Sequence, residues 1–109
     1  MPSNTVLRGN ILLSMLLAPT LSPISVAPNT VVEQTFTVAG LQVGDFVNVS
    51  KPTTQTGLGI ANSRVSALNT LAIAFSNATA ATITPTPAEV YTIGLDRPEN
   101  PSNMPATAT

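Results

Sequence analysis

The sequence predicts a single all-β domain, an antiparallel β-sandwich of the jelly-roll or immunoglobulin-like type. From Val31 to Leu95, apolar and polar residues alternate in short stretches rich in Thr, Val and Ile, which is the pattern of half-buried strands. The 10 prolines and 6 glycines fall mostly between these stretches and indicate frequent turns. With 109 residues and 43% hydrophobic content, the chain is long and apolar enough to bury one core. No helix is expected between the strands.

The first two strands of the sandwich are predicted over Val31–Val38 and Asp45–Val49. The first stretch alternates in period two, with Val32, Gln34, Phe36 and Val38 on one face and Glu33, Thr35 and Thr37 on the other. Glycines at positions 40 and 44 indicate a turn between the two strands. Pro52 ends the second strand because proline lacks the N–H group that a central ladder requires.

The next two strands are predicted over Leu58–Ser66 and Thr70–Ser76, joined by a turn at Ala67–Asn69. The first of them is interrupted around Asn62–Arg64, where we expect a β-bulge. The second has the clearest alternation in the chain. Its inward residues are Leu71, Ile73 and Phe75.

The last two strands are predicted over Ala81–Thr84 and Glu89–Leu95, which brings the sandwich to at least six strands. Pro85 and Pro87 stop the shorter one. The longer one places Tyr91, Ile93 and Leu95 on one face. The chain has neither Cys nor Trp, so the core must be built from aliphatic residues and four aromatic ones. These are Phe36, Phe46, Phe75 and Tyr91.

Three segments follow from this pattern: residues 1–30 as an N-terminal arm or added strand, residues 31–97 as the β-sandwich domain, and residues 98–109 as a proline-rich extended tail. The run Ile11–Ala18 is the longest apolar stretch, yet it is shorter than the about 20 residues of a membrane span. Prolines at positions 19, 23 and 28 suit an extended reach, so we expect the run to pack on another chain. The interface residues on it are Ile11, Leu12, Leu13, Leu16 and Leu17.

Composition indicates a structural or binding module. The absence of His and Cys excludes a His general base, a Cys nucleophile and the metal sites built on these ligands. A net charge of -1 leaves no basic patch for a nucleic acid. We therefore expect no enzymatic activity, no cofactor or metal, and no nucleic acid, membrane or small-molecule partner.

The few charged residues offer two further candidates. Lys51 and Arg64 flank the polar loop Pro52–Gly57, where a basic pair would meet an acidic partner surface; the alternative is that they only contribute to solubility. Two carboxylate pairs, Asp45 with Glu89 and Asp96 with Glu99, would suit acid–base chemistry if they were brought together. No spacing forces either pair together, and solvated turn carboxylates are the favoured interpretation.

Three stretches carry a resemblance to a known family: EQTFTVAGLQVGD (Glu33–Asp45), VNVSKPTTQTGLGIANSRVSALNTLAIAF (Val47–Phe75) and ITPTPAEVY (Ile83–Tyr91). They resemble a family of small virion structural proteins of tailed bacteriophages. The resemblance implies a β-sandwich capsid cement or decoration protein on the capsid surface of the virion, without enzymatic activity. It implies the major capsid protein and copies of the chain itself as partners. The symmetry of capsid lattices suggests a homotrimer.

Two other functions stay open from the sequence. One is a phage tail or neck appendage. The other is a receptor-binding adhesion module, in which the loops Lys51–Gly57 and Asn77–Ala80 would hold a carbohydrate or a host protein. Carbohydrate sites usually present aromatic faces. The aromatic residues here all fall in predicted strands, which disfavours the adhesion hypothesis.

Overall fold

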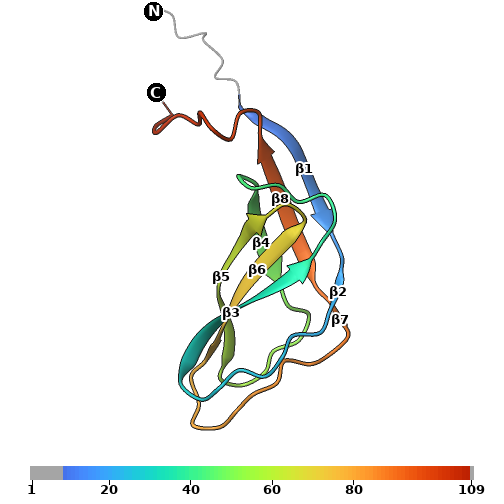
Figure 1. Ribbon diagram of the computed structural model, residues 1–109, viewed down its shortest axis with the longest axis vertical. Helices are drawn as coiled ribbons and strands as arrows, with labels where there is room; N and C mark the ends of the chain where they lie inside the picture. Colours follow the sequence, from blue (N-terminus) through green and yellow to red (C-terminus); the bar gives the residue numbers. More distant parts are fainter. Residues whose placement is uncertain (1–8, 109) are drawn as a thin grey trace, which may run out of the picture.

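The computed structural model describes residues 9–108, and within them the chain is all-β, without a helix. Its strands form two three-stranded antiparallel sheets and one two-stranded ribbon (Figure 1). The strands are β1 (Ile11–Leu17), β2 (Thr20–Leu21), β3 (Thr30–Thr37), β4 (Phe46–Ser50), β5 (Leu58–Ala67), β6 (Thr70–Asn77), β7 (Glu89–Val90) and β8 (Thr92–Pro98). The predicted all-β antiparallel class is confirmed.

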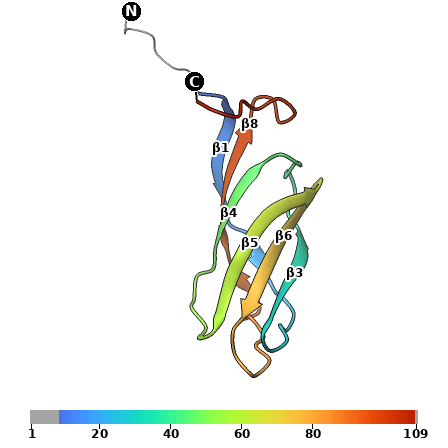
Figure 2. The same ribbon diagram turned by 90° about the vertical axis from the view of Figure 1, so that its left-hand side faces the viewer.

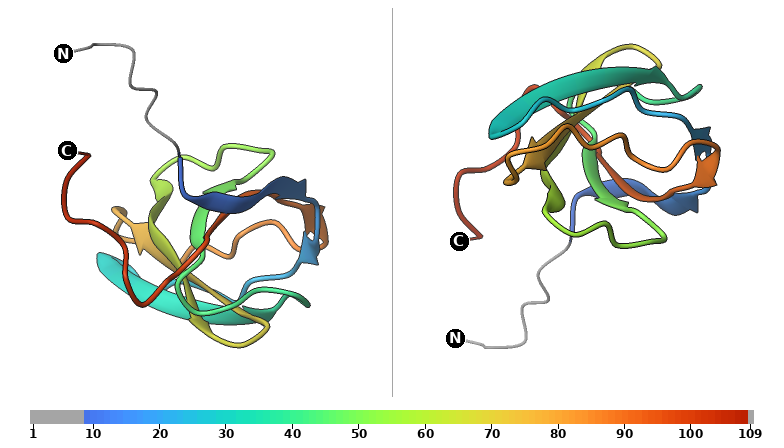
Figure 3. Two further views of the ribbon diagram at one scale, coloured as in Figure 1. Left: turned by 90° about the horizontal axis from the view of Figure 1, so that it is seen from above. Right: turned by 90° about the horizontal axis from the view of Figure 1, so that it is seen from below.

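The two larger sheets face each other across one core. One has the strand order β1-β8-β4 and the other β3-β6-β5, while β2 and β7 form the ribbon. Figure 2 shows β5, β6 and β3 side by side in one layer, and Figure 3 shows β1, in blue, and β3, in teal, on opposite sides of the molecule. The layers are also joined between β4 and β5, where the Ser63 hydroxyl donates to the Val47 carbonyl at 3.3 Å.

The central strand of each sheet supplies most of the core. In β6, Leu71, Ile73 and Phe75 are fully buried, as the alternation predicted. Ala72 and Ala74 face the other side of the sheet. They are buried as well, although the alternation placed them outward. Small residues suit this face because the neighbouring strands carry long side chains beside them: Arg64 lies opposite Ala72 in the register.

β8 provides the matching half of the core, and here too the predicted inward face is confirmed. Tyr91, just before the strand, and Ile93 are fully buried, and Leu95 is nearly so. Val47 of β4 joins them from the neighbouring strand. These residues and those of β6 form a single hydrophobic cluster, so the two sheets fold as one unit.

Side-chain hydrogen bonds close the end of the sandwich at which β3 begins and β6 ends. The buried amide of Gln34 in β3 donates to the Ile24 carbonyl and accepts from the Ile24 N–H, both at 2.9 Å. The amide of Asn77, 1% exposed, donates to the carbonyls of Val26 and Ala81 and accepts from the Thr79 N–H. Because buried polar groups need partners, these two amides fix the loops around them.

The strands differ from the predictions in β5, at Ala81–Thr84, and at Tyr91, where the predicted strand Glu89–Leu95 is divided into β7 and β8. Register shifts in β5 fall between Ile60 and Asn62 and between Val65 and Ala67, on either side of the predicted bulge at Asn62–Arg64. The predicted strand Ala81–Thr84 is wrong: only an isolated bridge joins Val26 and Ile83. The reason is that the Asn77 side chain already binds the Ala81 carbonyl, and the prolines that follow offer no N–H group.

Phe46 is not part of the core. Its side chain is 65% exposed, so the prediction that it belongs to the core aromatics is wrong. β4 turns Val47 and Val49 inward, and the period of two then sends Phe46 to the outer face. The core consequently rests on Phe75 and Tyr91, with Phe36 half-buried beside them.

The N-terminal segment is an added strand within its own chain. β1 pairs antiparallel with β8, from Ile11 opposite Pro98 to Leu17 opposite Ile93. Leu13 and Leu17 pack against the chain's own core, which corrects the expectation that they contact another chain. The packed domain therefore includes residues assigned to the arm, and its last strand ends at Pro98, where the tail was expected to begin. Residues 1–8 and 109 of the predicted arm and tail lie outside the described residues.

Candidate functional site

The outer face and free edge of the β1-β8-β4 sheet expose large apolar side chains. Leu12 is 66% exposed and Leu16 73%, and Ile11 and Met15 of the same strand are exposed as well. The Leu16 side chain lies over Gly94, which has no side chain to cover it. We call the exposed residues Ile11, Leu12, Leu16, Phe46 and Met104 the apolar end.

A hollow of about 400 Å³ lies within the apolar end. It is formed where β1 and β4 begin, where β8 ends, and where the C-terminal tail crosses. Its lining residues include Ile11, Phe46, Asp96, Pro98 and Met104. The hollow therefore offers apolar walls with two carboxylates, Asp96 and an Asp45 that is already bound by Arg97, which suits an apolar side chain of a protein partner rather than an anionic ligand.

An ion pair fixes the shape of this end. Arg97 of β8 donates from Nε to Oδ1 of Asp45 and from Nη2 to Oδ2, both at 2.9 Å, and Nη2 also donates to the Gly40 carbonyl. The Asp45 side chain is only 2% exposed, and the bond from Arg97 holds its pKa below the usual value. Gly44, at φ +100°, sits directly against Pro101 and lets the tail approach β4 closely.

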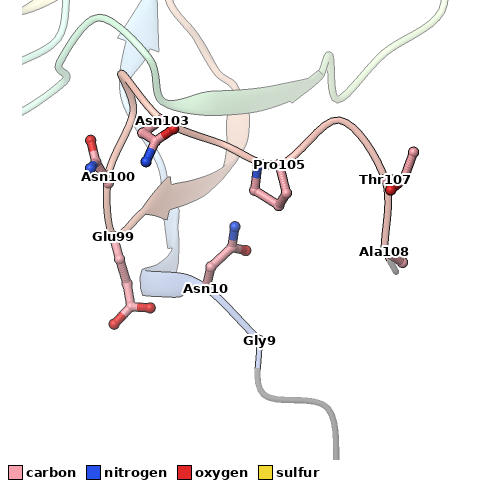
Figure 4. A pocket seen from close by; sticks show the side chains of 8 residues that line it. All are labelled: Gly9, Asn10, Glu99, Asn100, Asn103, Pro105, Thr107 and Ala108. Carbon is pink, nitrogen blue, oxygen red and sulfur yellow. The ribbon is translucent and has the colours of Figure 1, made fainter.

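A second hollow, of about 580 Å³, lies between the start of β1 and the tail (Figure 4). Its walls are mainly amide and small side chains, and Glu99 is the only charged residue among them. The residues are Gly9, Asn10, Glu99, Asn100, Asn103, Pro105, Thr107 and Ala108. Because Glu99 is the one carboxylate in this lining, the hollow itself brings no pair of carboxylates together.

Lys51 belongs to a shielded cluster that sequence reasoning missed. Its Nζ lies 2.9 Å from Oε1 of Glu89, with both side chains 10% exposed, and it donates to the carbonyl and hydroxyl of Thr53. The Thr53 hydroxyl donates to Oε2 of Glu89 at 2.6 Å, and this bond, followed by Lys51, lowers the Glu89 pKa. One sequence signal could have indicated this cluster: Thr53 follows Lys51, the only lysine of the chain, by two residues.

Arg64 is held by a different carboxylate, so the predicted basic pair is divided. It donates from Nε and Nη2 to the two carboxylate oxygens of Glu33 in β3, each at 2.8 Å. Lys51 and Arg64 are thus each neutralised by an acid of their own chain. An acidic partner would have to compete with these carboxylates.

The structure separates one of the two carboxylate pairs considered from the sequence: Asp45 binds Arg97, whereas Glu89 binds Lys51. No group of three His, Cys, Asp or Glu residues in the range 9–108 is placed to hold a metal ion. In the same range, no helix is long and apolar enough to cross a membrane.

Comparison with known proteins gives no relative for this chain. No family model, no curated protein and no solved structure matches it. Function must therefore be argued from the surface itself, and the resemblance to phage virion proteins depends only on the sequence stretches that carry it.

Proposed function

We propose that the chain is a non-enzymatic structural protein that binds other protein subunits through its apolar end. The observation that carries this proposal is the group of exposed large apolar side chains at the apolar end, three of which, Ile11, Phe46 and Met104, line the hollow. Several large apolar side chains left exposed around a hollow are typical of a protein–protein contact site. The ion pair of Arg97 with Asp45 keeps the surface in place before a partner arrives.

Within this class, we propose a capsid cement or decoration protein of a tailed bacteriophage, located on the capsid surface. Support comes from the resemblance of Glu33–Asp45, Val47–Phe75 and Ile83–Tyr91 to that family. A sandwich with a rigid core and one apolar end is suited to bridging shell subunits. The proposed partners are the major capsid protein and copies of the chain itself, arranged as a homotrimer near local threefold axes.

Electron microscopy of phage particles tests the proposal. Particles that lack the protein should lose a surface feature of the shell and withstand less heat, and adding back the purified chain should restore both. The double variant Leu16→Asp with Phe46→Asp should fail to restore them. Ile24→Asp is the matched control, because Ile24 is 70% exposed and lies outside the apolar end.

The alternative is a tail or neck appendage or a receptor-binding module. A complete, equally heat-resistant shell with a missing tail or neck feature would replace the cement proposal by the appendage. Specific binding of the free protein to a glycan array or to host cells would favour the adhesion module. Absence of the protein from purified particles would overturn every virion role.

A further inference from the structure

β1 is an open edge of the sandwich. In the sheet order β1-β8-β4 it has a hydrogen-bonded neighbour, β8, on one side only, among the residues that the structure describes. A strand in this position presents a row of N–H and C=O groups that can pair with another chain.

The phase of the β1–β8 ladder shows which residues present these groups. The Tyr91 N–H donates to the Pro19 carbonyl at 2.9 Å, at the end where Leu17 lies opposite Ile93. Hydrogen-bonded pairs alternate along an antiparallel ladder, so residues 17, 15 and 13 direct their backbone groups toward β8. Ser14 and Leu16 consequently direct theirs toward the open edge.

The edge lacks most features that prevent pairing. Ile11–Leu17 contains no charged residue and no proline, which are the usual protection of an edge strand. β3, an edge of the other sheet, carries Glu33 bound to Arg64. A register shift between Ile11 and Leu13 is the one protective irregularity in β1, and it leaves the stretch from Leu13 to Leu17, which contains Ser14, in regular register with β8.

The sequence of β1 is complementary to itself. Three apolar residues precede Ser14 in β1, and three apolar residues follow it. An antiparallel copy centred on Ser14 would set Met15 opposite Leu13, Leu16 opposite Leu12 and Leu17 opposite Ile11. Because Ser14 directs its N–H and C=O outward, it can form the hydrogen-bonded pair that a two-fold axis at this residue requires.

We propose that β1 of one chain pairs antiparallel with β1 of a second copy about a two-fold axis at Ser14. The two three-stranded sheets then become one continuous sheet, and Leu12 and Leu16 of both copies form an apolar strip across its outer face. The occupant is a second copy, because an uncharged edge with apolar residues on both sides of Ser14 is complementary to itself. The inference does not depend on a virion role; in a shell, such contacts would connect neighbouring trimers across two-fold axes.

Disulfide trapping tests the register directly, since the chain has no Cys of its own. Hydrogen-bonded antiparallel partners have Cα atoms about 5.5 Å apart, within the range that a disulfide spans. Mild oxidation of Ser14→Cys should therefore yield a covalent dimer rapidly. Thr35→Cys, an exposed position on the edge strand β3, is the matched control and should cross-link only slowly. Equal rates for the two variants would overturn the register.

Sedimentation velocity tests the contact without cross-linking. The wild-type chain should shift from monomer to dimer with rising concentration, and Leu16→Lys should lose this shift while its circular dichroism stays unchanged. Ile24→Lys should dimerise as the wild type does. A wild-type chain that stays monomeric, or a Leu16→Lys variant that still dimerises, would overturn the proposal. Neither result would decide whether the protein is part of a virion, which the particle experiment tests separately.

Discussion

β6 and β1 are apolar strands of similar length with different roles. β6 lies between β3 and β5, and its residues from Leu71 to Phe75 are all buried. β1 borders β8 alone, and three of its residues, Ile11, Leu12 and Leu16, are more than half exposed. Apolar residues thus stabilise the fold where a strand is covered on both faces and both edges, whereas several of them stay exposed where the strand is an edge.

The largest difference between the two strands should appear when the same residue type is truncated in each. Leu71→Ala removes a fully buried side chain and should lower the free energy of unfolding by about 2–5 kcal/mol. Leu16→Ala removes a side chain that is 73% exposed and should change it by no more than about 0.5 kcal/mol. Urea denaturation at a concentration where the chain is monomeric measures both. Similar losses would show that β1 is as much a part of the core as β6.

The next effect concerns the ion pair that supports the apolar end. Asp45→Asn should destabilise the protein at neutral pH, because it weakens the bonds that Arg97 makes to an almost fully buried carboxylate. The folded-state pKa of Asp45 is lowered, so its stabilising contribution is complete above the unfolded value and is lost as the pH falls through the folded one. Thermal unfolding of both proteins should therefore differ at pH 7 and converge in acid. A difference that is independent of pH would contradict this.

The sequence predicts the inward residues of the central strands β6 and β8, but it does not predict which side chains of the outer strands are exposed. Period two and local turns were sufficient for β6 and β8, because their inward residues are fixed by alternation alone. The prediction for Phe46 is wrong because it gave more weight to the aromatic side chain than to the alternation in β4, where Val47 and Val49 face the core and Phe46 lies on the outer face. The roles of Asn77 and Glu89 depend on segments far apart in the chain, which no local pattern reveals.

A smaller effect is expected at the buried hydroxyl of Tyr91. Among the described residues this hydroxyl has no hydrogen-bond partner, and burial together with the charge of Glu89 raises the Tyr91 pKa to about 12. A raised pKa means that stability is complete below the unfolded value near 10 and is lost as the pH rises toward 12. Tyr91→Phe should leave the neutral stability equal or slightly higher and lose less in alkali. Tyr91 is the only tyrosine, so its ultraviolet titration reports this pKa directly; an ordinary value would contradict the burial argument.

The smallest effects should separate the two remaining ion pairs, which lie in different surroundings. Arg64 and Glu33 lie across the outer face of the β3-β6-β5 sheet with side chains 54% and 34% exposed, whereas Lys51 and Glu89 are each 10% exposed. Solvent and salt screen an exposed pair more strongly than a shielded one. Double-mutant cycles with alanine should therefore give a weak coupling for Arg64 with Glu33 that disappears in high salt, and a stronger coupling for Lys51 with Glu89 that persists. Equal salt dependence of the two couplings would contradict this prediction. It would show that the low exposure of Lys51 and Glu89 does not protect their ion pair from solvent and salt.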